Sequence, residues 1–194
     1  MTIKQRVKSW GVILQGENDD YSFLPEQLLR NFPSKCYFAD YFPRAVSDVY
    51  AEKYAQIERE IYDTICKRMY RALLKLWVYD DIYIESELLY SRKMIKKKII
   101  GRRVLKEMMS NYIKKEKNLK WLMQLSRKNV IDLALAFEKL HMVMVPSWSC
   151  FFLFIEDDSS VPFIKSVLNT EGLYLRNAYT SEHDTENDSG EMKR

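Results

Sequence analysis

Helix-breaking residues are almost absent from the middle of this chain, and that absence constrains its fold more than any other feature. All five prolines lie outside residues 44–145, and Gly101 is the one glycine within that span. Proline removes a backbone donor and clashes with the preceding helical turn, so a long stretch without it permits long helices. We therefore expect the middle of the chain to be helical.

Within this span, residues 46–76 are predicted to form one long helix. Apolar side chains recur there at spacings of three and four, which places them on a single helical face. Ser47 is the expected N-cap, and the segment runs from acidic to basic, as the helix dipole favours. The basic residues Lys67, Arg68 and Arg71 fall largely off the apolar stripe.

A second helical region is predicted over residues 92–140. The apolar residues of 99–114, 119–125 and 129–140 suit three successive helices, and Asn129 is the expected N-cap of the last one. Between the two helical regions, β-branched and aromatic side chains alternate after the turn-forming pair Asp80 and Asp81, which predicts a short strand at about 81–85.

The two ends of the chain are predicted to supply most of the sheet. Residues 10–14 and 173–176 fit short strands, and residues 149–155 are continuously apolar from Cys150 onward, which is typical of a central strand covered on both faces. The fold class is therefore α+β. Its helical middle, at about 46–76 and 92–140, packs on a small sheet built from N- and C-terminal segments.

Composition predicts one domain over residues 1–179 and a flexible polar tail over residues 180–194. Apolar residues make up 47% of the chain, enough for a packed core, while the last fifteen are rich in acidic and hydroxyl side chains. The three cysteines form no paired motif, and no uncharged run reaches the roughly 20 residues of a bilayer span. We expect a cytoplasmic protein without membrane contact.

Charge is strongly segregated along the sequence. Residues 92–128 hold 14 of the 31 basic residues and two acids, a net charge of +12, so the rest of the chain carries −8. Phosphate contacts need only positioned positive charge, and each neutralised phosphate releases counterions. A basic helical face would therefore bind nucleic-acid phosphate without reading sequence, and Trp121 and Tyr112 offer rings on which unpaired bases can stack. The candidate polyanion-binding residues are Lys96, Lys97, Lys98, Arg102, Arg103, Lys106, Lys114, Lys115, Lys120 and Trp121.

Two other functions stay open, beside a lysine-rich face that is merely solvated. A protein-interaction module of the immunity or antitoxin type would use the basic face and the long helix to dock on an acidic protein. A metal-dependent hydrolase would use the carboxylates Asp80, Asp81 and Glu85. The first of these differs from nucleic-acid binding only in its partner, whereas the second predicts catalysis.

A non-enzymatic role is favoured because motifs that carry catalysis are weak in this sequence. Cys150 lies in an apolar segment where a thiol is inert, and His141 and His183 lie far apart. The glycines do not cluster into a phosphate-binding loop. We therefore expect no cofactor and no metal, and a small binding protein whose partner is nucleic acid or an acidic protein.

Overall fold

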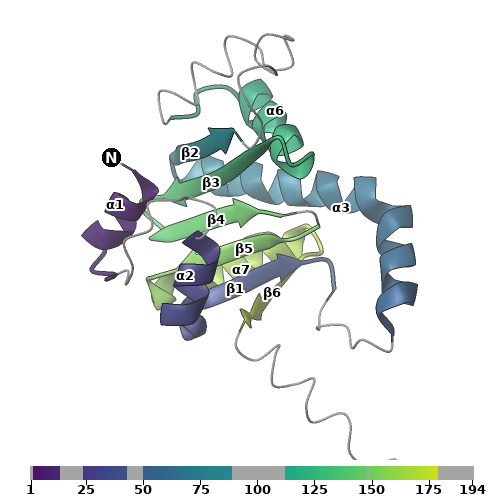
Figure 1. Ribbon diagram of the computed structural model, residues 1–194, viewed down its shortest axis with the longest axis horizontal. Coiled ribbons are helices and arrows are strands. Elements are labelled where there is room, and N and C mark those ends of the chain that lie inside the picture. Colours follow the sequence, from purple (N-terminus) through teal and green to yellow (C-terminus); the bar gives the residue numbers. More distant parts are fainter. Residues whose placement is uncertain (1, 14–23, 43–49, 89–111, 148, 179–194) are drawn as a thin grey trace, which may run out of the picture.

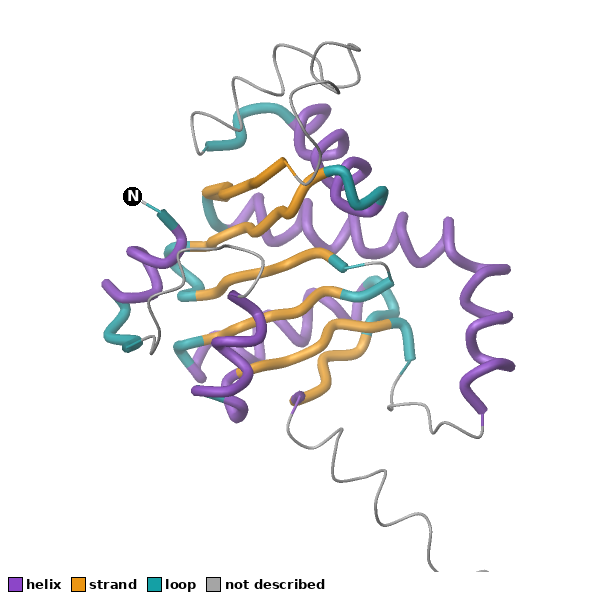
Figure 2. Tube along the Cα trace, viewed as in Figure 1, coloured by secondary structure: helices purple, strands orange, loops and turns teal. Residues whose placement is uncertain are grey.

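One six-stranded sheet organises the protein, as the computed structural model shows over residues 2–13, 24–42, 50–88, 112–147 and 149–178. The strands lie in the order β2-β3-β4-β5-β1-β6, and each neighbouring pair is antiparallel (Figures 1 and 2). They are β1 (Cys36–Asp40), β2 (Ile82–Leu88), β3 (Ile131–Phe137), β4 (Met142–Pro146), β5 (Phe151–Ile155) and β6 (Tyr174–Asn177). With its long helices, this sheet confirms the predicted α+β class.

Helices cover both faces of the sheet. In Figure 1, α3 and α7 lie behind it, α1 and α2 lie in front, and α6 lies over the end formed by β2 and β3. The two 3-10 turns, η2 (Pro33–Lys35) and η4 (Asp158–Ser160), precede β1 and α7. The α-helices of the described residues are α1 (Ile3–Ser9), α2 (Leu24–Asn31), α3 (Ala51–Tyr79), α6 (Glu116–Arg127) and α7 (Val161–Thr170).

Along each strand, successive side chains point to opposite faces of the sheet, so each face has its own hydrophobic core. In β3, Leu133 and Leu135 join the core between the sheet and helices α3, α6 and α7, whereas Ala134 and Ala136 face α1 and α2. Every residue of β5 is buried in one core or the other. A strand buried on both faces reads as a continuous apolar run, so the predicted central strand at 149–155 is confirmed.

Helix α3 confirms the long helix predicted at 46–76, although it is seen from Ala51 onward and Ser47 lies outside the described residues. Its buried side chains Ile65, Met69 and Leu76 recur at helical spacing and pack in the larger core. Figure 2 shows the helix turning, so that its first turns stand beside the sheet and its later turns run along one face. The later turns therefore position the side chains discussed below.

A buried aspartate fixes the end of α3 against the sheet. Asp80 is 2% exposed, and its carboxylate accepts backbone N–H groups from Lys139 at 2.7 Å and Leu140 at 3.1 Å, in the turn between β3 and β4. Burial raises the pKa of Asp80 above its ordinary value, although both hydrogen bonds act to lower it. This carboxylate therefore joins the helix to the sheet.

The helix predicted at 129–140 is wrong, because Ile131–Phe137 form strand β3. Asn129 does not begin a helix; it closes α6 in the left-handed region, with φ of 51°. Its N–H bonds to the Ser126 carbonyl, and the N–H of Val130 bonds to that of Leu125, which is a Schellman motif. The apolar run that follows fits a strand covered on both faces as well as it fits a buried helix.

The strand predicted at 10–14 is also wrong where the structure describes it, because the chain before it forms α1. Thr2 caps that helix in a capping box with Gln5. Gly11, with φ of 90°, ends the helix in the same motif as Asn129, with Val12 donating to the Val7 carbonyl. The helix predicted at 99–114 lies outside the described residues up to position 111, and Tyr112, near its end, forms an isolated β-bridge with Tyr83 instead. The predicted segments 81–85, 119–125 and 173–176 correspond to β2, α6 and β6.

Candidate anion-binding groove between α3 and α6

Helices α3 and α6 enclose an open groove of about 410 Å³. Its walls follow helical spacing, at i, i+3, i+4, i+7 and i+8 on α3 and at i, i+3, i+4 and i+7 on α6. They therefore present one stripe from each helix. The lining residues are Asp63, Cys66, Lys67, Tyr70 and Arg71 of α3 and Lys120, Met123, Gln124 and Arg127 of α6.

Amphipathic helices explain why basic side chains gather in this groove. On α6, Leu119, Leu122 and Leu125 are buried in the larger core, while Lys120 and Gln124 of the same turns stay exposed. On α3, Ile65 and Met69 are buried in that core, which turns Lys67 outward. Packing two such helices against one sheet aligns their outward stripes.

The groove carries a net positive charge, with four cations and the single carboxylate of Asp63 along its walls. Arg127 is held in place by a 3.1 Å hydrogen bond from its Nη2 to the Cys66 carbonyl. Within the described part of the chain, neither Lys67 nor Lys120 forms an ion pair. Two of the four cations therefore have no ion-pair partner among the residues that the structure describes.

A tyrosine ties the two walls of the groove together. The Tyr70 hydroxyl of α3 lies 3.2 Å from the Glu116 carbonyl oxygen and 3.3 Å from its Oε1, at the start of α6. Burial, followed by the charge of Glu116, raises the pKa of Tyr70 to about 12. The hydroxyl therefore stays protonated at neutral pH and acts as a hydrogen-bond donor between the helices.

The structure places four of the ten predicted contact residues. Lys114 and Lys115 are exposed just before α6, Lys120 lines the groove, and Trp121 is 36% exposed on the next position of the helix. The other six predicted contacts lie outside the described residues: Lys96, Lys97, Lys98, Arg102, Arg103 and Lys106.

Three cations of the groove were missing from the predicted set. Arg127 belongs to the basic segment, but Lys67 and Arg71 come from a helix about fifty residues earlier. The sequence shows that both fall off the apolar stripe of α3 and are therefore exposed. It does not show that α6 packs beside them, because that neighbourhood depends on sheet order.

Tyr112 and the predicted carboxylate set make structural hydrogen bonds. The Tyr112 hydroxyl donates to Asp81 at 2.9 Å, and Glu85 accepts the N–H of Ile3 at 2.5 Å. Asp80 holds the turn described above. The described residues include no group of three or more His, Cys, Asp or Glu side chains placed to hold a metal ion.

Comparison of the chain with models of known protein families, with curated proteins and with solved structures gave no match. Among the described residues, none of the helices has both the length and the apolar character needed to cross a bilayer. Fold and groove together define the class: an α+β protein with an open, positively charged groove between two helices on one side of its sheet.

Proposed function

We propose that this protein binds the phosphate backbone of nucleic acid, in the cytoplasm, and that the groove between α3 and α6 holds part of that backbone. The observation that carries the proposal is the pairing of Lys67 and Lys120 in one groove without an acidic partner among the described residues. Like charges gathered on a surface repel each other, and a polyanion removes that cost while it releases counterions.

The sequence around the groove supports the same ligand. Helix α6 ends the segment 92–128, which carries a net charge of +12. Lys114, Lys115 and Lys117 are exposed at the beginning of α6. Polyphosphate ligands favour such extended positive surfaces because their charges repeat along a chain.

Salt titration tests the proposal. Binding of a labelled oligonucleotide should weaken as salt rises, and the double variant Lys67→Gln/Lys120→Gln should flatten the slope of log K against log salt by about 1.4 to 1.8, the loss of two phosphate contacts. The control is Lys165→Gln, which neutralises one exposed lysine of α7 and should leave the slope unchanged. Absence of binding at low salt, or an unchanged slope in the double variant, would refute the proposal.

A protein-interaction role is the second candidate, and a different surface favours it. Val78 is 90% exposed at the end of α3, next to Tyr79, whose ring lies 4.4 Å from that of Phe163 on α7. The Lys139 ammonium lies 5.9 Å from the Tyr79 ring. An apolar patch beside a cation suits an acidic protein segment. Capture of a partner that survives nuclease treatment and is lost in Val78→Asp would favour this role.

A further inference from the structure

Trp121 differs from the other described tryptophans in being exposed. Trp10 stacks on His141 with 5.2 Å between ring centroids, and Trp77 packs against the larger core. Trp121 is 36% exposed on α6 and lies directly after Lys120 of the groove. A large ring left partly in water beside a cationic groove is a surface on which another flat ring can stack.

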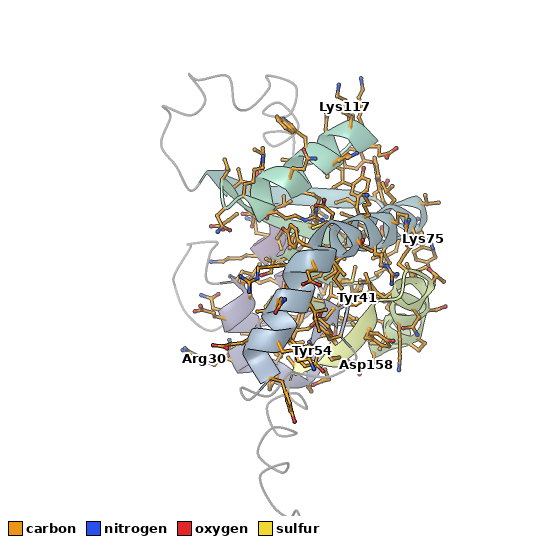
Figure 3. The ribbon with its side chains drawn as sticks, turned by 90° about the vertical axis from the view of Figure 1, so that its right-hand side faces the viewer. Arg30, Tyr41, Tyr54, Lys75, Lys117 and Asp158 are labelled. Carbon is orange, nitrogen blue, oxygen red and sulfur yellow. The ribbon has the colours of Figure 1, made fainter. Side chains whose placement is uncertain are left out.

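Helical phasing puts Trp121 on the outer rim of the groove. At about 100° per residue, it lies about 60° from Gln124 and on the same outward stripe as Lys117 and Lys128. Both lysines are exposed, and Figure 3 shows Lys117 pointing away from the protein. The ring is therefore flanked by cations along the helix and faces solvent on the side away from α3.

This arrangement separates two kinds of contact. Phosphates in the groove would meet Lys67, Lys120 and Arg127, which line it, while a base attached to that backbone would extend over α6 toward Trp121. In a duplex the bases stack on each other and their faces are closed to such a ring. In a single strand they are open, and a cationic groove with an aromatic rim is the usual way proteins hold one.

We propose that the groove selects single-stranded over double-stranded nucleic acid, with a base stacked on Trp121. The inference rests on the proposed function, since it assumes that the groove holds the phosphate backbone. It assigns Trp121 the discrimination between the two forms, and it assigns Lys67 and Lys120 the charge contact that both forms share.

The experiment compares an oligo(dT) of about 12 nucleotides with a duplex of the same length, by fluorescence anisotropy on the full chain. Trp121→Leu keeps an apolar side chain but removes the stacking ring, and Trp121→Phe keeps a ring. We expect Trp121→Leu to bind the single strand about tenfold more weakly and the duplex unchanged, and Trp121→Phe to stay within about threefold of the parent chain. Lys120→Gln should weaken both ligands alike.

Each outcome decides between the two proposals. Equal affinity of the parent chain for single strand and duplex, or equal losses for both ligands in Trp121→Leu, would overturn the single-strand inference and leave phosphate binding standing. Absence of binding to either ligand would overturn the proposed function, and this inference with it. Circular dichroism of the Leu and Phe variants checks that both keep the parent fold.

Discussion

Helix α3 lies beside one helix on each side, and the charged side chains are paired differently at the two contacts. Toward α7, the carboxylate of Glu171, 7% exposed, accepts Arg71 Nε at 2.6 Å and lies 2.7 Å from Lys75 Nζ (Figure 3 labels Lys75). Toward α6, four cations share the groove with Asp63 alone. The α7 contact is balanced by the chain itself, whereas the α6 contact has an excess of positive charge.

Arg71 makes the comparison informative because it belongs to both contacts. It lines the groove, yet its guanidinium is bound to Glu171. Lys75 is held similarly, by Glu171 and by the Thr170 hydroxyl at 2.7 Å. Cations on one helix therefore divide into those paired with Glu171 and those, such as Lys67, that form no ion pair within the described residues.

Reversing charge on the α6 side should have the largest effect. In Lys67→Glu/Lys120→Glu, we expect oligonucleotide affinity to fall about a hundredfold, since two attractions become repulsions. The melting temperature of the double variant should equal that of the parent chain, because both side chains are exposed and neither forms an ion pair within the described residues. Anisotropy and thermal unfolding measure the two quantities, and Lys165→Glu, which reverses one exposed lysine of α7, is the control. A drop in affinity of the same size in Lys165→Glu would remove the distinction between the two sides of α3.

Removing charge on the α7 side should affect stability and leave binding nearly intact. Glu171→Gln leaves Arg71 and Lys75 without their carboxylate, and we expect a loss of about 1–2 kcal/mol in the free energy of unfolding, less than for a fully buried pair because both cations are partly exposed. Oligonucleotide affinity should stay within about threefold. Denaturant unfolding tests this against Glu52→Gln, an exposed acid of α3. Equal stability of the two variants would contradict a structural role for Glu171.

Acid should weaken the α7 contact in particular. Burial alone would raise the pKa of Glu171, but the hydrogen bonds and charges of Lys75 and Arg71 outweigh it and hold the pKa below its ordinary value. A carboxyl with a lowered folded pKa contributes stability above its unfolded value of about 4.3, and that stability is lost as pH falls through the folded pKa. The parent chain should therefore lose more stability below about pH 4.3 than Glu171→Gln does. Parallel pH profiles of the two unfolding free energies would contradict this.

The smallest effect is expected where the two walls of the groove are tied together. Tyr70→Phe removes the hydroxyl that contacts Glu116, and we expect a loss of about 0.5–1 kcal/mol in unfolding free energy. Because the pKa of Tyr70 is raised to about 12, the loss should be the same from pH 6 to pH 9. Urea unfolding at both pH values measures it. A difference that grows within this range would mean that the hydroxyl titrates there.

Fold class and most elements could be predicted from the sequence, and both errors come from one cause. Three helices end in a Schellman motif, at Gly11, Asn129 and Gly172, each with positive φ. The sequence predicts a strand over residues 10–14, which include Gly11, and predicts that Asn129 begins a helix. A residue that favours a cap does not reveal which end it caps, and an apolar run such as 131–137 suits strand and helix alike.

The site could be predicted only in part, for a different reason. Charge excess along the sequence points to Lys120 and Trp121, because they lie within the segment 92–128, which holds 14 of the 31 basic residues. Lys67 and Arg71 share their helix with Glu52, Glu58 and Glu60, so local charge did not mark them. They line the groove only because α6 packs beside α3. That long-range contact cannot be predicted from hydrophobic periodicity or local charge along the sequence.

The central claim is that the α6 side of α3 binds the ligand and the α7 side does not, and amide chemical shifts test it most directly. Titration of the labelled protein with oligo(dT) should shift amides of residues 63–71 and 116–127, the helical segments that contain the lining residues of the groove. The amide chemical shifts of α7 should not change, except near its contact with Arg71. Shifts concentrated on α7, or no shifts in either groove helix at saturating ligand, would contradict the account.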